Sequence, residues 1–165
     1  MESRAKLLGH PVHQMLVPLP AGLFVVAAVL DIVGTFVNWT WIPTVTYWNI
    51  ALGIGTALLA AMFGTADAIR IPNGTRAKRV AVMHGVGNVI AVALFGTALW
   101  LRTDDMRYGP SALALGIEVA AFALLAVTGW LGGELVDRLG VGVDDGAHVD
   151  APSSLQEKHV SGLRP

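Results

Sequence analysis

The sequence predicts an all-α integral membrane protein, a four-helix bundle whose spans run up-down-up-down. Its 165 residues are 54% hydrophobic and only 14% charged, whereas a soluble domain typically carries about 25% charged residues. The mean hydropathy is +0.60. The apolar residues form four long runs separated by short polar stretches, which is the pattern of a chain that crosses a membrane four times.

Each apolar run is long enough to cross a bilayer as a helix, because the hydrocarbon core needs about 20 helical residues. The expected spans are residues 15–37, 48–69, 80–101 and 111–136. Helices are expected because a backbone in lipid must satisfy its own hydrogen bonds, and the sequence lacks the alternating pattern of a barrel.

The expected spans define one four-helix transmembrane domain over residues 1–139. The tail over residues 140–165 is rich in Asp, Gly, Ser and Pro. Such a composition buries too little apolar surface to fold, so we expect this cytoplasmic tail to be disordered, with His148 and His159 in solvent.

The charges of the loops predict the orientation. The first loop, residues 38–47, carries no charge, and the third loop balances two basic against two acidic residues: Arg102, Arg107, Asp104 and Asp105. The N-terminal segment and the second loop are basic, through Arg4, Lys6, Arg70, Arg76, Lys78 and Arg79. The positive-inside rule therefore predicts a multi-pass inner-membrane protein with both termini in the cytoplasm and the lipid bilayer as its immediate partner.

Aromatic residues support the same orientation. They gather at the opposite, outer interface, where such rings anchor a protein between lipid and water: Trp39, Trp41, Tyr47, Trp48, Trp100 and Tyr108.

Prolines shape the start of the first span. Pro11 suits a helix start, which makes His10 a flanking residue and places His13 in the first turn. Pro18 and Pro20 remove backbone donors, so a kink is expected there.

Glycines recur with a similar spacing in the second and third spans. The stretch from Gly53 to Ala66 matches the stretch from Gly85 to Ala98 in its glycines and in a Phe-Gly-Thr-Ala sequence. The match is either a trace of duplication or the recurrence of small residues that close helix packing in lipid favours.

Ionisable residues within membrane spans are costly and are therefore candidates for function. Most of them gather at the cytoplasmic end of the spans: His10, His13, Asp67, Arg70, Arg79, His84, Glu134, Asp137 and Arg138. At that end, ion pairing and snorkelling are the explanation that requires no function. Asn88 follows His84 by one helical turn. Asp31 and Glu118 lie deeper, and we expect them to be hydrogen-bonded within the bundle, with no role assigned.

The histidines predict a b-type haem, held between two imidazoles on opposing helices. His13 and His84 are the expected axial ligands, with His10 as the alternate for His13, and their two spans are diagonal partners in an up-down bundle. Arg70 and Arg79 lie where haem propionates would emerge. The working hypothesis is an electron-transfer subunit rather than a stand-alone enzyme.

Two alternatives remain open. One is a transition-metal site or a proton relay built from nitrogen and oxygen donors: His10, His13, His84, Asp67 and Glu134. The other is a membrane anchor without a cofactor that serves a redox partner.

The composition also excludes several classes of function. Cysteine is absent, which excludes disulfides, thiolate-held iron–sulfur clusters and c-type haem attachment. No basic patch interleaved with aromatic residues is present, so nucleic acid is not an expected partner.

Four motifs resemble a bacterial membrane family, domain of unknown function 2231, over roughly residues 8–143. They are Gly9-His10-Pro11-Val12-His13 with the Leu16–Pro20 stretch, Asp67-Ala68-Ile69-Arg70-Ile71-Pro72, His84 followed by Asn88, and Gly129-Trp130-Leu131-Gly132-Gly133-Glu134-Leu135-Val136 leading to Gly140-Val141-Gly142-Val143. A tyrosine is common in the family where Asp137 stands here.

The resemblance implies a four-helix membrane protein without an agreed function. Some relatives look to be joined to Rieske-type iron–sulfur domains, which favours electron transfer. This chain lacks such a domain, so a separate Rieske-type protein is the expected redox partner, and a second copy of the chain is a further candidate partner.

Overall fold

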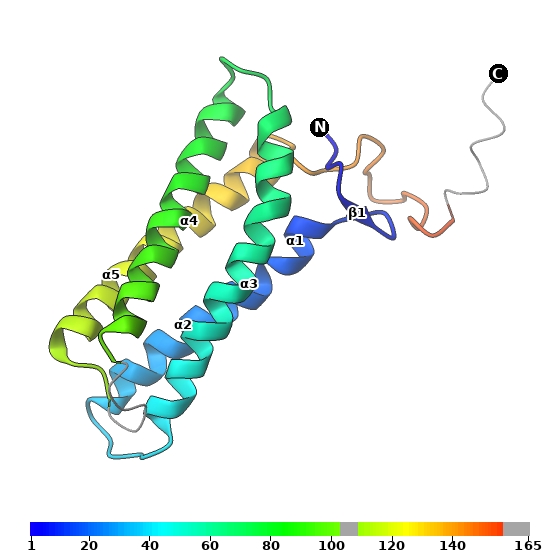
Figure 1. Cartoon of the computed structure of the whole chain (residues 1–165). Helices are drawn as coiled ribbons and strands as arrows, with labels where there is room; N and C mark the ends of the chain where they lie inside the picture. Colours follow the sequence, from blue (N-terminus) through cyan, green and yellow to red (C-terminus); the bar gives the residue numbers. More distant parts are fainter. Residues whose placement is uncertain (103–108, 157–165) are drawn as a thin grey trace, which may run out of the picture.

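The computed structural model describes residues 1–102 and 109–156. In this part of the chain, four helical spans are long and apolar enough to cross a membrane: Val12–Gly34, Ile42–Arg70, Arg76–Trp100 and Ala112–Arg138. Successive spans run in opposite directions (Figure 1). The predicted four-helix bundle is confirmed.

The first span is preceded by a short β-hairpin and is interrupted once. Strand β1 (Lys6–Leu7) pairs antiparallel with β2 (His10–Pro11). Helix α1 (Val12–Leu16) then stops at Val17, and α2 (Pro18–Gly34) begins. Pro18 opens α2 because its missing N–H costs nothing in a first turn. The interruption covers Val17 alone, whose backbone keeps helical angles, and the kink that the prolines predict stays a prediction.

The second and third spans begin where local chemistry favours a helix start, several residues before their hydrophobic runs. Helix α3 (Ile42–Arg70) has Pro43 in its first turn, where a missing N–H costs nothing. Helix α4 (Arg76–Trp100) follows Thr75, whose hydroxyl accepts the Lys78 amide hydrogen at 3.1 Å. The Thr75 cap satisfies an amide group that has no partner within the helix.

The last span combines an α-helix with a π-helical turn. Helix α5 (Ala112–Gly133) begins after Ser111, whose hydroxyl accepts the Ala114 amide hydrogen at 3.2 Å. The π-helical turn η1 (Glu134–Arg138) continues the helix to the end of the bundle.

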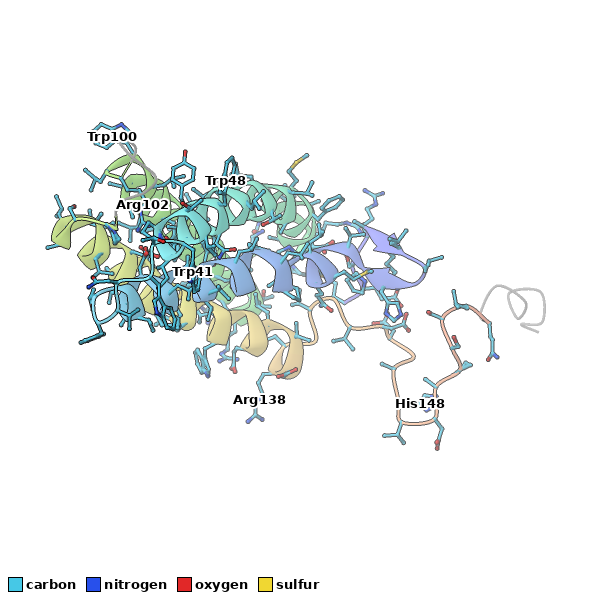
Figure 2. All side chains as sticks on the ribbon, turned by 90° about the horizontal axis from the view of Figure 1, so that it is seen from below. Trp41, Trp48, Trp100, Arg102, Arg138 and His148 are labelled. Carbon is cyan, nitrogen blue, oxygen red and sulfur yellow. The ribbon has the colours of Figure 1, made fainter. Side chains whose placement is uncertain are left out.

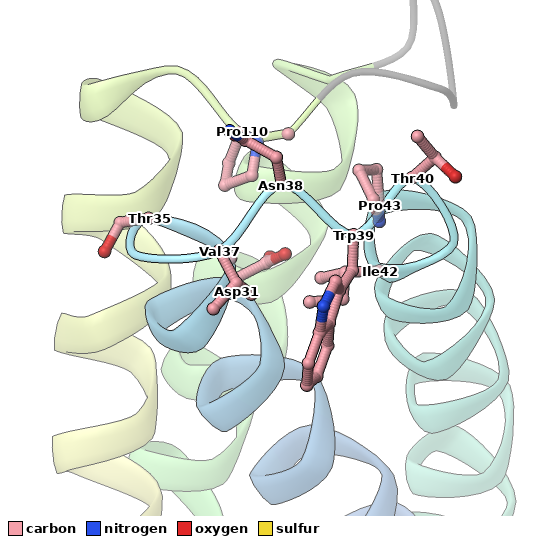
Figure 3. Close-up of a pocket in the computed structure, with 11 residues that line it drawn as sticks. Asp31, Thr35, Val37, Asn38, Trp39, Thr40, Ile42, Pro43 and Pro110 are labelled. Carbon is pink, nitrogen blue, oxygen red and sulfur yellow. The ribbon is translucent and has the colours of Figure 1, made fainter.

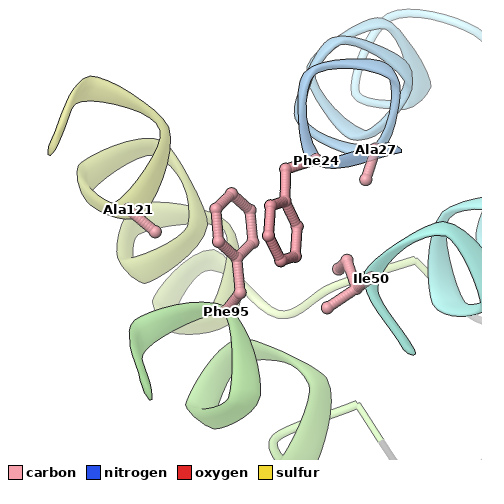
Figure 4. Packing of buried hydrophobic residues seen from close by; sticks show 5 residues of the cluster. All are labelled: Phe24, Ala27, Ile50, Phe95 and Ala121. Atoms are coloured by element: carbon pink, nitrogen blue, oxygen red, sulfur yellow. The ribbon is translucent and has the colours of Figure 1, made fainter. Parts of the chain in front are cut away.

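The four spans form two hairpins, α2 with α3 and α4 with α5, whose internal contacts are the most extensive in the fold. Phe24 of α2 stacks on Phe95 of α4 across the centre, with ring centroids 4.1 Å apart and planes at 10°. Ile50 of α3 and Ala121 of α5 close the sides of this stack (Figure 4). Gly53 admits the Phe24 ring, because a Cβ atom there would lie 2.7 Å from it.

The two hairpins bury side chains at equivalent positions. Asp31 and Arg102 are 71 residues apart, and the same separation relates Phe24 to Phe95 and His13 to His84. A second separation in the sequence relates buried residues of α3 to buried residues of α5. Three pairs of buried residues share it: Thr46 with Ala114, Ile50 with Glu118, and Ala60 with Thr128. This correspondence joins the first span to the third and the second to the fourth, whereas the glycine match joins the second to the third.

The two ends of the bundle differ in their exposed side chains. The tryptophan end carries the exposed Trp39, Trp41, Trp48 and Trp100. The opposite end, called the histidine end below, carries His13 and His84. Figure 2 shows Trp48, Trp100 and Arg102 toward the first of these ends and Arg138 toward the second.

The tail contacts the N-terminal segment as far as the structure describes it. The terminal amine of Met1 donates to the Gly140 carbonyl at 3.0 Å, and the Gly142 amide donates to the Met1 carbonyl at 2.8 Å. Lys6 bonds Asp144 at 3.1 Å. The domain boundary after residue 139 and the disorder of the tail stay predictions, and residues 157–165, with His159, lie outside the described residues.

Replacing Phe95 with alanine tests the central stack. Phe95→Ala removes the ring partner of Phe24 and opens a cavity beside Ile50. We expect a loss of about 3 kcal/mol in unfolding free energy, at the lower end of the range for buried Phe. Reversible unfolding in mixed micelles measures it. Phe36→Ala is the matched control, because Phe36 is 83% exposed, and equal losses in the two variants would contradict the packing described here.

Replacing Lys6 with methionine tests the contact between the N-terminal segment and the tail. The side-chain bond to Glu2, and then that to Asp144, raises the pKa of Lys6. The Gly146 amide hydrogen, and then Lys6, lowers the pKa of Asp144. The contact is therefore lost as pH falls through the lowered pKa of Asp144 or rises through the raised pKa of Lys6.

Hydrogen–deuterium exchange at the Gly142 amide measures this contact. In Lys6→Met we expect exchange about two- to fivefold faster, the small effect typical of exposed ion pairs. Lys78→Met, which removes a bond to the Ala68 carbonyl instead, should leave the Gly142 amide unchanged. The same exchange rate in Lys6→Met as in the unmodified chain would rule the contact out.

Candidate functional site

His13 is held against the second span by its ring. Its Nδ1 atom lies 2.8 Å from the carbonyl oxygen of Ala60 in α3. Because a carbonyl only accepts, Nδ1 carries the hydrogen, and Nε2 carries the lone pair of the neutral ring. Gly64, one turn further along α3, makes room for the ring, since a Cβ atom there would lie 2.7 Å from Cε1. Within the described residues, no hydrogen bond reaches Nε2 of His13.

His84 repeats this arrangement in the second hairpin. Its Nδ1 atom lies 2.8 Å from the carbonyl oxygen of Thr128 in α5. Gly132, one turn further on, admits the ring, because a Cβ atom there would lie 3.0 Å from Cε1. Nε2 of His84 is 3.1 Å from the Asn88 amide nitrogen, and the Thr128 hydroxyl donates to the Asn88 oxygen at 2.9 Å. Asn88 therefore donates to the lone pair of His84 and holds it in a fixed direction.

The structure brings His13 and His84 to the same end of the bundle. Their helices, α1 and α4, belong to the first and third spans, which are diagonal in the bundle because each packs mainly on the second and fourth. Both rings are half-buried.

Three of the other residues expected at this site have other surroundings. His10 is exposed in β2, outside the helix that carries His13. Asp67 accepts hydrogen bonds from the N-terminal segment, at 2.6 Å from the Ser3 hydroxyl and 3.1 Å from the Arg4 amide. Glu134 pairs with Arg76 at 2.5 Å. Asp67 therefore joins the N-terminal segment to the end of α3, and Glu134 joins the end of the last span to the start of α4.

The basic residues expected near a cofactor lie at the surface of the histidine end. Arg70 and Arg79 are exposed, and Arg79 donates to the Gly74 carbonyl at 3.5 Å. In residues 1–102 and 109–156, no group of three His, Asp or Glu side chains gathers to hold a metal ion. The structure thus places His13 and His84 at one end of the bundle, while both the haem and the metal assignment stay predictions.

A second polar cluster lies at the tryptophan end and includes a residue that the sequence places in a loop. Arg102 follows α4 and is 6% exposed. Its Nη2 atom donates to Asp31 Oδ2 at 2.5 Å and to Glu118 Oε2 at 2.6 Å, and Nη1 donates to the Thr46 hydroxyl at 3.1 Å. The expectation that Asp31 and Glu118 are hydrogen-bonded within the bundle is confirmed. Arg102 supplies those bonds. Asp104 and Asp105, the acidic residues of its own loop, lie outside the described residues.

A cavity of about 330 Å³ opens at this end. Asp31 lies at its base, below the Val37–Thr40 loop (Figure 3). One signal in the sequence points to this cluster: two acidic residues within spans require a cation at the same depth, and Arg102 directly follows the third hydrophobic run.

The comparison with protein families matches residues 9–145 to a family described as a predicted membrane protein, domain of unknown function 2231. The chain belongs to this family. The matched residues of this DUF2231 protein include His13 and His84 as well as Asp31, Arg102 and Glu118, so both polar clusters lie within the family domain. No curated protein and no solved structure matches the chain.

Enlarging Gly64 tests how His13 is held. Gly64→Ala places a methyl group against the ring, which must move away from the Ala60 carbonyl. We expect the Nδ1 hydrogen bond to be lost and the ¹⁵N resonances of a labelled His13 to shift. Gly55→Ala is the control, because a Cβ atom at Gly55 would meet nothing within 4 Å. An unshifted His13 signal in Gly64→Ala would contradict the contact.

Proposed function

We propose that this membrane protein is an electron-transfer subunit that binds a b-type haem through His13 and His84. The observation that carries the proposal is the pair of equivalent hydrogen bonds from Nδ1 to a backbone carbonyl. Each bond fixes the ring and leaves its lone pair on Nε2, which is the orientation that a metal-ligating imidazole needs.

The two donors fit the group that the hypothesis requires. Bis-histidine haem ligation takes one neutral imidazole from each of two facing helices. His13 and His84 come from diagonal spans at one end of the bundle and occupy equivalent positions in the two hairpins. When bound, the haem would supply one-electron chemistry, and the chain would supply the ligands and an apolar surround.

Binding requires two local changes. Asn88 has to release Nε2 of His84, which it contacts at 3.1 Å. The hairpins have to separate at the histidine end. Contacts between hairpins are fewer than contacts within them, so this separation leaves the best-packed helix pairs intact.

The charges of the histidine end fit an acidic ligand at the membrane surface. Arg70 and Arg79 are exposed there, where they can pair with propionates. With both termini in the cytoplasm, this end faces the inside of an inner membrane. A separate Rieske-type protein is the redox partner that the family resemblance favours, and a second copy of the chain remains a candidate.

A haem titration of the purified full-length protein, followed by optical absorption, tests the proposal. We expect the unmodified chain to give the spectrum of a bis-histidine haem. His13→Ala and His84→Ala should each weaken binding beyond the roughly 10–100-fold that an outer-shell change costs. His10→Ala is the matched control, because His10 is exposed in β2, and it should bind normally.

Two results would decide against this function. If His10→Ala abolishes binding while His13→Ala does not, the ligand assignment is wrong. If the unmodified chain binds neither added haem nor a transition-metal ion, the cofactor-free anchor replaces the haem and metal hypotheses.

A further inference from the structure

The cluster at the tryptophan end carries more acid than base. Two carboxyl groups, Asp31 and Glu118, contact the guanidinium of Arg102, which stays protonated in proteins. Asp31 is 2% and Glu118 0% exposed. Among the described residues, Arg102 is the one cation that pairs with either carboxyl. With both carboxylates ionised, the cluster would hold an uncompensated negative charge in a low-dielectric interior, which is strongly unfavourable.

The hydrogen bonds of the cluster point to the same imbalance. Asp31 Oδ1, Glu118 Oε1 and Arg102 Nε are buried and have no partner among the described residues. The two carboxyl groups lie side by side, because Asp31 Oδ2 and Glu118 Oε2 contact the same Nη2 atom of Arg102, at 2.5 and 2.6 Å. Two carboxylates can only accept, whereas a protonated carboxyl donates one hydrogen bond. One proton therefore supplies a donor for the two free carboxyl oxygens and removes the excess charge. The Nε–H group of Arg102 is itself a donor, so the proton leaves it without a partner among the described residues.

The structure also provides a route for this proton. Asp31 lines the cavity at the tryptophan end together with Gly34, Thr35, Asn38 and Pro110 (Figure 3). On the opposite side of Asp31, the apolar cluster around Phe24 and Phe95 fills the centre of the bundle. A proton at Asp31 can therefore exchange with water at the tryptophan end and is shielded from the histidine end.

We propose that Asp31, Glu118 and Arg102 form a proton-binding site that holds one exchangeable proton between the two carboxyl groups and opens to the tryptophan end of the bundle. The ligand is the proton itself, and no bond other than O–H forms or breaks. The site is separate from His13 and His84, so its test is independent of haem binding.

Infrared spectroscopy of the purified full-length protein at neutral pH tests the site, because a protonated carboxyl absorbs apart from carboxylates. We expect one such band in the unmodified chain. Asp31→Asn and Glu118→Gln should each lose it, since the remaining carboxylate balances Arg102. Glu134→Gln is the control, because Glu134 pairs with Arg76 at the other end, and it should keep the band.

Two results would overturn the proposal. One is an unmodified chain without a protonated carboxyl band at neutral pH, a measurement that needs no variant to fold. The other is a band that survives in both Asp31→Asn and Glu118→Gln.

The access route has its own measurement, which uses the absence of native cysteine. When the protein is transferred into D2O, the proton of the carboxyl group exchanges and its infrared band shifts. In Thr35→Cys, a bulky maleimide attached at the cavity should slow this shift at least tenfold. The same reagent on Thr97→Cys, which replaces an exposed residue of α4 outside the cavity lining, should leave the rate unchanged. Equal rates in the two modified proteins would exclude the cavity as the route.

Discussion

The guanidinium of Arg102 is the contact on which the tryptophan end depends, because it bonds side chains from the three other spans. Asp31, Thr46 and Glu118 come from α2, α3 and α5, and all three are buried. Each of these charges is tolerable within a membrane only in the presence of the others. Removing Arg102 would leave both buried carboxyl groups without a cation, which costs more than a surface pair contributes. All four spans must therefore be in place before Arg102 has all of these partners.

The apolar centre separates this cluster from the histidine end. Phe24 lies seven residues before Asp31 and eleven after His13, about 10 and 16 Å along a helix. Its stack with Phe95 joins the two hairpins directly. Each polar end therefore draws on the first and third spans but lies in its own surroundings, so the chemistry of one end can be changed without rebuilding the other.

Much of the fold follows from hydropathy, and the errors have local causes. The number of spans is predictable because it depends on the hydropathy of the individual residues. The interruption before Pro18 is predictable because proline lacks a backbone N–H. The helix starts are harder to predict from hydropathy. Helices α3 and α4 begin earlier than their hydrophobic runs because Pro43 and Thr75 favour a helix start. Arg102 lies one residue beyond the third run, where a hydropathy pattern ends and a loop is expected.

The residue types of the candidate site are predictable from the sequence, but the contacts of those residues are not. The histidines stand out because they are few and lie in membrane spans. The groups that hold them, the carbonyls of Ala60 and Thr128, have no sequence signature, since every residue carries a carbonyl. Asp67 and Glu134 have carboxylate groups that suit a metal site, but their oxygens are bonded to Ser3 and Arg76 instead.

The opposite charges at equivalent positions of the two hairpins make the halves of this protein non-interchangeable. Two copies of the first hairpin, paired as the halves are here, would set Asp31 against Asp31. Two copies of the second would bring together two Arg102–Glu118 pairs without the carboxyl group of Asp31. Like charges facing each other in an apolar interior are a strong penalty on the wrong assembly of the first hairpin. The first half thus selects the second over a copy of itself, even though the stacked rings at the centre would suit either pairing.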